Sequence, residues 1–421
     1  MPEVPGASSQ RPVVLQPAHS GGGSEGRKRL EIWREKTITL ACHLLSIAFD
    51  LPRRLRGKAV PQLADLPLNS RVALIKPCCL GDVLLATATI GAIAEARPDL
   101  SLEFVVSRWA RPPLPGNPHL ARLIPTGVDG SVLNWRKYWQ LARRLRREKY
   151  AAALVLDRSP RLNLLPWLAG IPVRAGVDNL YRGFALNVRA TQGPQLQHEA
   201  EVYLDVARAL GVKPRQPRLE YHPPEGTPNP YASLNLDPAR PLAVIHPGGG
   251  QNPDTQVLSK RWPAERFGEI AARLIQKGWQ VVILGAANDR AAAAELSRTA
   301  EKALNDAERA LLINACGKFD FAASGALLTH AKLFVGNDTG FMHLAVACGA
   351  AVVAIFGPSS PIAYGPYTSR GRTVAPVREG MLAGLPLKEY QALSVAEGGI
   401  TSVSVEAAWE QIETLISDLS L

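Results

Sequence analysis

Cysteine is scarce in this chain, with five among its 421 residues, namely Cys42, Cys78, Cys79, Cys316 and Cys348. These cysteines form no C-x-x-C pair. Their number and spacing argue against both a zinc site and a disulfide framework. We therefore expect no metal site, and such sparse use of cysteine is typical of a reducing compartment.

Several short motifs of common enzyme classes are also missing. No G-x-G-x-x-G follows a predicted strand and opens a helix, which disfavours a nicotinamide-dependent dehydrogenase. The pair Gly317-Lys318 lacks both the earlier glycine and the following Ser or Thr of a phosphate-binding P-loop. The H-E-x-x-H motif of zinc metalloproteases does not occur.

The N-terminal region has one apolar run, and this run is short. Residues 37–49 are 13 uncharged residues, whereas a membrane-spanning helix needs about 20. The run also begins too late for a secretory signal. Because basic clusters flank it, we expect a helix that lies in an anionic membrane interface, and docking on the folded domain is the alternative. The clusters are Arg27, Lys28, Arg29, Arg34 and Lys36 before the run and Arg53, Arg54, Arg56 and Lys58 after it.

Positive charge is in excess, with 48 Lys and Arg against 37 Asp and Glu and a net charge of +11. This excess favours anionic partners such as nucleic acid, a membrane surface or phosphorylated small molecules. The sequence has no nucleic-acid-binding motif and no pattern of stacking aromatics, so we expect no nucleic-acid partner. A second basic segment with aromatic residues, 135–149, is either a further membrane contact or an ordinary solvated helix face.

The chain divides into a tail, an extension and a first domain. Residues 1–26 are rich in Pro, Gly, Ser and Gln and are predicted to be a disordered tail, and residues 27–66 form a basic apolar helical extension. From residue 67 to residue 220, short apolar runs alternate with helical stretches, which predicts an α/β domain with a mainly parallel sheet. The predicted strands are 72–75, 102–106 and 151–157, and the predicted helices are 82–96 and 132–148.

The same alternation restarts after a proline-rich stretch. We place the linker at 221–240 and a second α/β domain at 241–421, and we expect the terminal helix to pack back on the first domain. Two doubly wound domains in succession bind ligands at the carboxyl ends of their strands, in the cleft between them. The predicted strands are 242–245, 280–284, 332–335 and 351–356, and the predicted helices are 264–277 and 341–348.

The first of three polar loops that follow predicted strands covers residues 76–82. Its glycine, Gly81, permits a tight turn or a close approach of the backbone to a ligand. Asp82 stands where the next helix begins. This position suits a helix cap, which accepts hydrogen bonds from free backbone amides. It also suits a carboxylate at a cleft edge that takes a proton from an acceptor hydroxyl.

The second and third loops lie in the other half of the chain. In residues 254–263, Lys260 stands beside hydroxyl residues and before a helix, which suits phosphate binding, although a Lys-Arg pair is also common on solvated surfaces. In residues 336–343, a strand, a small polar loop and a helix start make an anion site from backbone amides and the helix dipole. The alternative is that Asp338 caps this helix and that His343 is partly buried in the interface.

Together the loops resemble glycosyltransferase family 9, the heptosyltransferases of lipopolysaccharide core assembly. The match agrees in order and spacing over about residues 70–375, and the combination of Leu-Gly-Asp with Asp-Thr-Gly-x-x-His in one chain is fairly specific. The first 65 residues have no counterpart, and Cys78-Cys79 stand where the family usually has small hydroxyl residues. The matching residues are Ile75-Lys76-Pro77, Leu80-Gly81-Asp82, His246-Pro247-Gly248, Lys260, Trp262-Pro263, Asn337-Asp338-Thr339-Gly340, His343-Leu344-Ala345 and Phe356-Gly357-Pro358.

The resemblance implies a GT-B fold, with two Rossmann-like domains facing across a cleft, here with an N-terminal extension. It implies inverting transfer without a required metal or other cofactor, from a nucleotide sugar such as ADP-heptose to a lipid-linked glycan. It further implies a cytoplasmic, peripheral location at the inner face of the bacterial cytoplasmic membrane. In this scheme Asp82 is the general base, in an acceptor-side loop with Lys76 and Gly81. The implied donor-side residues are Lys260 at the diphosphate, Asp289 at the ribose, and Thr255, Asp338, Thr339, Gly340 and His343.

Two other functions remain compatible with the sequence. A sugar-nucleotide epimerase has a similar two-domain architecture but needs no acceptor. A degenerate relative would bind glycan or lipid without catalysis, and the presence of Asp82, Lys260 and His343 argues against it.

Overall fold

The computed structural model describes residues 24–55, 59–130, 134–193, 195–252, 255–377 and 387–421, with side chains except for 24–32, 52–55, 255–256 and 387–388. The predicted tail therefore lies outside the described residues as far as residue 23. Its last three residues are the start of a helix. Arg56 and Lys58 of the second basic cluster lie outside the described residues as well.

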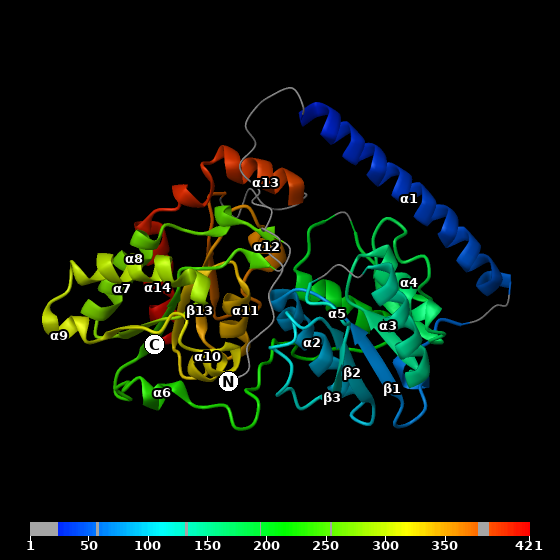
Figure 1. Ribbon diagram of the computed structural model, residues 1–421, viewed down its shortest axis with the longest axis horizontal. Coiled ribbons are helices and arrows are strands. Elements are labelled where there is room, and N and C mark those ends of the chain that lie inside the picture. Colours follow the sequence, from blue (N-terminus) through cyan, green and yellow to red (C-terminus); the bar gives the residue numbers. More distant parts are fainter. Residues whose placement is uncertain (1–23, 56–58, 131–133, 194, 253–254, 378–386) are drawn as a thin grey trace, which may run out of the picture.

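Two lobes are visible in Figure 1, and the first is built on a six-stranded sheet. Its strand order is β3-β2-β1-β4-β5-β6, and every neighbouring pair is parallel. This is the order of a Rossmann fold, in which the chain switches direction between the first and fourth strands and leaves a ligand crevice at their carboxyl ends. The strands are β1 (Arg71–Ile75), β2 (Ser101–Val106), β3 (Leu120–Pro125), β4 (Ala152–Val155), β5 (Val173–Asp178) and β6 (Val188–Thr191).

The second lobe repeats this plan. Its six strands follow the order β11-β10-β7-β12-β13-β14 and are again all parallel. The switch point therefore lies between β7 and β12, whose carboxyl ends carry two of the polar loops. The strands are β7 (Leu242–His246), β10 (Gln280–Ile283), β11 (Leu312–Asn314), β12 (Leu333–Asn337), β13 (Ala351–Ile355) and β14 (Gly371–Val374), and a separate antiparallel pair joins β8 (Gln251–Asn252) to β9 (Thr255–Gln256).

Helices cover both faces of each sheet, which explains why the central strands are continuous apolar runs. On the first sheet, α2 and α5 pack together on one face and α3 and α4 on the other. On the second sheet, α7, α8 and α14 share one buried cluster, whereas α10 and α11 lie on the face toward the first lobe. The helices are α2 (Leu80–Ala96), α3 (Trp135–Glu148), α4 (Pro160–Leu168), α5 (Glu199–Ala209), α6 (Pro230–Ser233), α7 (Ala264–Gln276), α8 (Arg290–Glu301), α9 (Asp306–Arg309), α10 (Phe321–Leu328), α11 (Gly340–Ala347), α12 (Pro361–Tyr364), α13 (Leu387–Ala396) and α14 (Val405–Leu419).

The lobes share an apolar core where α2 meets α11. Buried residues of both helices, among them Leu84 and Leu344, belong to the same cluster. The sequence led us to expect that the terminal helix packs on the first lobe, but α14 lies on the second lobe. It packs against α7, β13 and β14 because Ala408, Ile412 and Leu415 on its buried face join the core of the second lobe.

A long helix, α1 (Ser24–Leu55), precedes the first lobe and lies along its outside in Figure 1. In the parts of the chain that the structure describes, no helix is both long enough and apolar enough to cross a membrane. The uncharged part of α1 is too short, and charged residues flank it.

Candidate functional site

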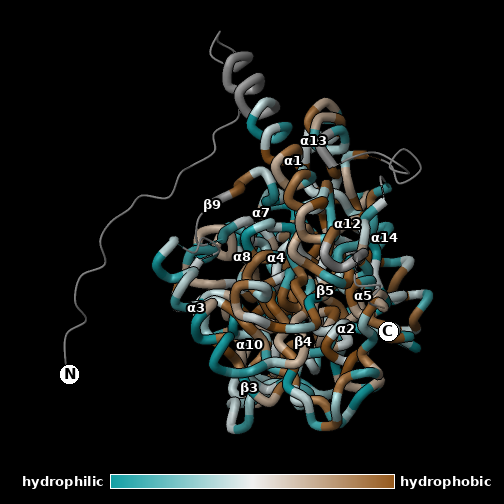
Figure 2. Tube along the Cα trace, turned by 90° about the vertical axis from the view of Figure 1, so that its right-hand side faces the viewer, coloured by the Kyte–Doolittle hydropathy of each residue, from teal (hydrophilic) through white to brown (hydrophobic). Residues whose placement is uncertain are grey.

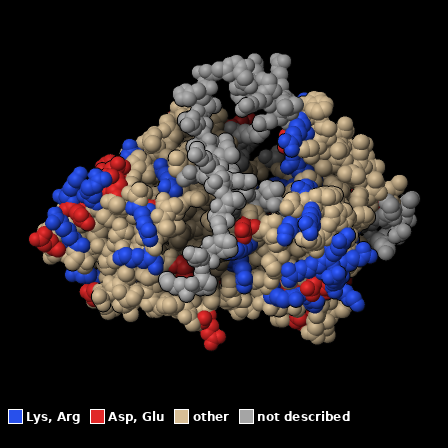
Figure 3. All heavy atoms as spheres, viewed as in Figure 1, with Lys and Arg blue, Asp and Glu red and all other residues tan. Residues whose placement is uncertain are grey.

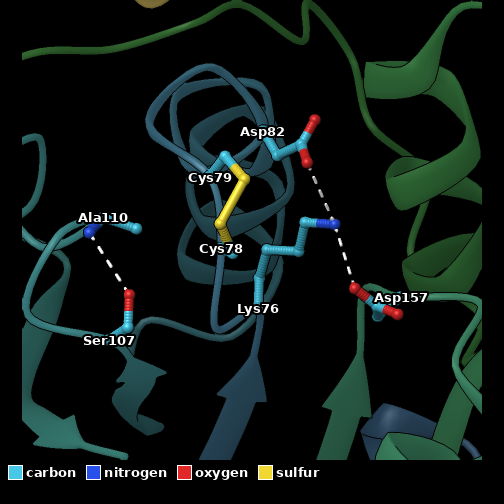
Figure 4. Close-up of a disulfide and its surroundings, with 7 residues drawn as sticks. All are labelled: Lys76, Cys78, Cys79, Asp82, Ser107, Ala110 and Asp157. Carbon is cyan, nitrogen blue, oxygen red and sulfur yellow. Dashed lines mark hydrogen bonds and ion pairs between the residues drawn. A yellow bond between two sulfur atoms is a disulfide. The ribbon is translucent and has the colours of Figure 1, made fainter. Parts of the chain in front are cut away.

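A buried lysine joins two carboxylates at the carboxyl edge of the first sheet. Lys76 follows β1, and its Nζ lies 3.2 Å from Asp82 Oδ2 and 3.1 Å from Asp157 Oδ2. Figure 4 shows the amine between the two carboxylates, with Asp82 on the first turn of α2 and Asp157 two residues after the end of β4. The crevice of the Rossmann topology thus holds a compact charged group with one carboxylate in excess.

The protonation states of this group follow from its burial. Burial alone would lower the pKa of the Lys76 amine, but Asp82 and Asp157 hold that pKa above its ordinary value. Burial raises the pKa of the Asp82 carboxyl, and the Lys76 cation opposes this shift. Lys76 therefore stays protonated, and Asp82 is a stronger base than an ordinary surface carboxylate.

Asp82 is not the helix cap that its position in the sequence allowed. The cap residue of α2 is Cys79, and Asp82 is the third residue of the helix. Its side chain turns toward Lys76 rather than back to a backbone amide. An acidic residue in the first turn of a helix is stabilised by the helix dipole.

Cys78 and Cys79, just before α2, are joined by a disulfide, which the sequence analysis did not anticipate. The bridge links neighbouring residues and ties no distant segments together, so it does not create a disulfide framework. The other three cysteines, Cys42, Cys316 and Cys348, are free. The bridge forms part of the loop that leads to Asp82.

An ion pair occupies the facing edge of the second lobe. Lys260 Nζ donates to Asp338 Oδ2 at 2.6 Å, and the Ser359 hydroxyl donates to the same oxygen. Asp338 does not cap α11, contrary to the alternative considered for it, since the cap residue is Thr339. The lysine is partly exposed and the aspartate is buried. The cation can therefore reach an incoming anion while the carboxylate holds it in place.

Several buried polar atoms near the start of α11 have no partner among the described residues. They are Thr339 Oγ1, Ser360 Oγ and His343 Nδ1. Buried polar groups are almost always hydrogen-bonded, so this cluster indicates a place for a polar ligand. His343 is buried, not just partly buried as considered, and burial lowers its pKa to about 4. Its imidazole is therefore neutral at physiological pH.

Asp289 lies beside this anion site. Its Oδ1 accepts a hydrogen bond from Arg261 Nη2 at 3.1 Å, and its Oδ2 lies 3.6 Å from His246 Nε2. Although burial acts in the opposite direction, contact with the His246 ring lowers the pKa of the Asp289 carboxyl. Gly249 has a φ of +111°, and a Cβ there would lie 2.0 Å from Thr339 Cγ2, so only glycine fits this loop.

One predicted donor residue cannot be placed at the site. Thr255 belongs to β9, which pairs with β8, but its side chain lies outside the described residues. The backbone of this hairpin approaches the glycine loop, where the Val257 amide donates to the Gly250 carbonyl at 2.7 Å.

The acceptor-side loop and the anion site meet across the interface between the lobes. A Cβ added to Gly81 would lie 3.0 Å from His343 Cδ2, and one added to Gly340 would lie 3.2 Å from Leu80 Cβ. A second contact between the lobes joins His198 Nε2 to the Gly365 carbonyl oxygen at 2.9 Å. The two helix N-termini therefore face each other, with Asp82 on one side and the Lys260 group on the other.

This chain is similar to several known proteins. The family model described as "Glycosyltransferase family 9 (heptosyltransferase)" matches residues 138–381, more than half of the chain. The chain belongs to glycosyltransferase family 9. It is a glycosyltransferase with the GT-B fold, as the resemblance of the motifs implied.

Relatives of this family 9 glycosyltransferase cover most of its length. It is 29% identical to lipopolysaccharide heptosyltransferase 2 of Escherichia coli K12 over 72% of this chain and 87% of the relative. It is 24% identical to lipooligosaccharide heptosyltransferase 2 of Haemophilus influenzae over 82% and 99%. The solved structure of E. coli ADP-heptose lipopolysaccharide heptosyltransferase II superposes with a TM-score of 0.63 at 25% identity, over 83% of this chain and 100% of that one.

The site of this glycosyltransferase contains residues that the sequence analysis missed. Asp157 is the last residue of the predicted strand 151–157, and this position at the carboxyl end of a strand could have identified it as a site residue. Arg158 makes a two-pronged ion pair with Glu199, at 2.6 and 2.7 Å, and this contact between distant segments left no signal in the sequence. Arg261 lies between Lys260 and Trp262, and Ser359 directly follows Pro358. Among the described residues, no three His, Cys, Asp or Glu side chains are grouped so as to hold a metal ion.

Proposed function

We propose that this glycosyltransferase moves heptose, or a closely related sugar, from an ADP-linked donor to a lipid-linked glycan such as lipopolysaccharide core. One observation carries the proposal. The Asp82 carboxylate and the anion site lie opposite each other across the interface between the lobes. The printed names of the relatives support heptose and lipopolysaccharide, and ADP-heptose is named for one of the similar structures.

Asp82 is proposed as the general base of an inverting transfer. The acceptor hydroxyl attacks the anomeric carbon as the bond to the diphosphate breaks, and Asp82 takes the hydroxyl proton. The raised pKa of Asp82 suits this role because a base works best when its pKa approaches the working pH. Lys76 positions the carboxylate and stays charged throughout.

The leaving diphosphate gains negative charge in the transition state, by analogy with the oxocarbenium-like state of glycoside hydrolysis. We propose that Lys260, the amides of Thr339 and Gly340 and the N-terminus of α11 stabilise this charge without a metal ion. Neutral His343 lies in the first turn of the same helix. Asp338 positions Lys260, because its carboxylate accepts a hydrogen bond from the Lys260 amine.

The remaining donor residues are assigned by their places around the anion site. Asp289, held by Arg261, is proposed to contact the ribose hydroxyls, because a carboxylate accepts two such hydrogen bonds. Thr255 is proposed to approach the phosphates from the β8–β9 hairpin. We also propose that the enzyme works at the cytoplasmic face of the bacterial inner membrane as a peripheral protein, since the proposed acceptor is a lipid.

Nucleotide binding and transfer test this proposal. The purified protein is titrated with ADP, UDP and GDP and then assayed with ADP-heptose and a soluble core oligosaccharide. We expect the tightest binding for ADP and a glycosylated oligosaccharide as product. An epimerised nucleotide sugar formed without acceptor would contradict the proposal and favour an epimerase, and absence of nucleotide binding would favour a degenerate relative.

Lys76→Met tests the electrostatic role of the buried amine. Because the Lys76 cation opposes the upward pKa shift of Asp82, its removal should raise the pKa of Asp82 further. The base is active when deprotonated, so the acid limb of the kcat/KM profile should move to higher pH. Profiles of wild type, Lys76→Met and the distant control Lys332→Met are compared at constant ionic strength. An acid limb that stays in place would separate Lys76 from the base.

A further inference from the structure

Helix α1 presents apolar side chains to solvent over much of its length, the reverse of an ordinary surface helix. Five large apolar residues on it are more than half exposed, and they recur at steps of seven, four, three and four residues, which places them along one side of a helix. We call this set the outer face of α1. Its residues are Trp33 (66% exposed), Leu40 (60%), Leu44 (59%), Ile47 (53%) and Leu51 (54%).

The polar residues of α1 instead fix the helix to the first lobe. Glu35 pairs with Arg182 at 2.5 Å, and Arg189 donates to the two carboxylate oxygens of Asp50 at 2.9 and 3.0 Å. Between these ion pairs, Cys42 is buried. Ion pairs on either side of Cys42 therefore hold the helix in one orientation, so its outer face is kept turned away from the protein.

The inner face of α1 rests near the catalytic edge of the first sheet. Its partners include Tyr181, whose ring lies 4.3 Å from that of His43, and Phe184, 5.5 Å from Phe49. These partners follow β5, and Lys76 and Asp157 follow β1 and β4 of the same parallel sheet. The carboxyl ends of parallel strands share one edge, so α1 and the acceptor-side carboxylates lie at the same end of the lobe.

We propose that the outer face of α1 inserts into the headgroup and acyl-chain boundary of an anionic bilayer and turns the acceptor side of the site toward the lipid. The choice of a bilayer rests on the proposed function, because the acceptor there is a lipid. The face runs from residue 33 to residue 51, about 27 Å along the helix axis. No Asp, Glu, Lys or Arg occurs between Lys36 and Asp50, and Asp50 points inward. A helix of this kind lies in the interface and does not span it.

Charges on the same side of the lobe favour a bilayer over a second copy of the chain. Figure 2 shows α1, α4 and α3 on the side that faces the viewer, and α4 contacts both of the others. On α3, Trp139 lines an open hollow of about 500 Å³ with Arg136 and Arg143. Figure 3, which is turned by 90° from the view of Figure 2, shows further Lys and Arg side chains on the adjoining face of the same lobe. A symmetric dimer would bring equal positive surfaces together, whereas anionic headgroups complement them.

Vesicle binding by matched variants tests the inference. Wild type, Leu40→Glu/Leu44→Glu and the control Leu68→Glu/Val395→Glu are sedimented with phosphatidylglycerol–phosphatidylethanolamine vesicles and with phosphatidylcholine vesicles. The control changes two apolar residues outside α1 that are more exposed than Leu40 and Leu44, and it adds the same charge. We expect the α1 variant to lose about 100-fold in partitioning onto anionic vesicles, while the control binds like wild type. Added salt and phosphatidylcholine should both weaken wild-type binding.

Further readouts separate the other possibilities. Nucleotide binding and melting temperature check that each variant is folded, and light scattering without vesicles measures the oligomeric state. Equal vesicle binding by wild type and the α1 variant, or a wild-type dimer that the α1 variant dissociates, would overturn the inference. Vesicle binding without any transfer activity would refute only the proposed function. If the protein transfers sugar to a soluble oligosaccharide but does not bind vesicles, only the proposal that the outer face of α1 inserts into a bilayer is refuted.

Discussion

Asp82→Asn should lower kcat by about 10² to 10⁴, the range that general base catalysis contributes, and leave donor binding almost unchanged. The amide has the shape of the carboxylate but cannot take a proton from the acceptor at neutral pH. The fold should persist because the cap of α2 is Cys79 and not Asp82. The donor site lies on the other lobe, so nucleotide affinity measured by titration should match that of wild type.

The matched control for this variant is Asp157→Asn. Asp157 contacts the same Lys76 amine at nearly the same distance, so this change removes an equivalent charge from the same group. Asp82, however, follows Gly81, which abuts His343 across the interface. We therefore expect a much smaller loss for Asp157→Asn. A larger loss for Asp157→Asn than for Asp82→Asn would assign the base to Asp157.

Lys260→Ala should weaken diphosphate binding by about 10- to 100-fold, because a hydrogen bond to a charged group contributes roughly 1.5–3 kcal/mol. The effect should grow with the number of phosphates. Affinities of adenosine, AMP and ADP are compared for wild type and variant, with the exposed Lys302→Ala as control. Equal weakening of all three ligands would show that Lys260 does not contact the phosphates.

The same variant should also lower stability. Asp338 is buried, and among the described residues its carboxylate would keep the hydroxyl of Ser359 as its hydrogen-bond partner once Lys260 is removed. Breaking a fully buried ion pair costs about 3–5 kcal/mol, and we expect a smaller loss here because Lys260 is partly exposed. Binding is therefore measured well below the melting temperature. Asp338→Asn in addition to Lys260→Ala should recover part of the stability and none of the diphosphate affinity, which separates the two effects.

Most interior strands were predicted from the sequence, whereas the edge strands and the interior strand β5 were not. Residues 72–75 and 242–245 are apolar throughout because β1 and β7 are covered by helices on both faces. The edge strand β3 has the burial pattern of a half-exposed strand and contains Arg122. In β14, every residue except Val374 is partly exposed. An arginine interrupts the apolar residues of each strand, Arg122 in β3 and Arg372 in β14, so neither has the continuous apolar run of a central strand, although both complete the Rossmann topologies.

The residue types of the candidate site, and their order along the chain, were determined by the sequence itself. Loops after strands can carry Lys76, Asp82, Lys260 and His343 to the carboxyl edges of two sheets, because parallel strands bring those edges together. Which partner each side chain takes was decided only by the tertiary structure. Asp82 pairs with Lys76 rather than capping a helix, and Asp338 pairs with Lys260, because burial favours a charged partner over solvent.

The orientation of α1 is the clearest case of a feature that the sequence left open and the tertiary structure decided. Composition established an apolar segment between basic clusters, and both a membrane interface and docking on the domain were compatible with it. The folded lobe supplies Arg182 and Arg189, which bind Glu35 and Asp50 and so decide which side of the helix faces the protein. These partners are more than 130 residues away in the chain, beyond the reach of any local pattern.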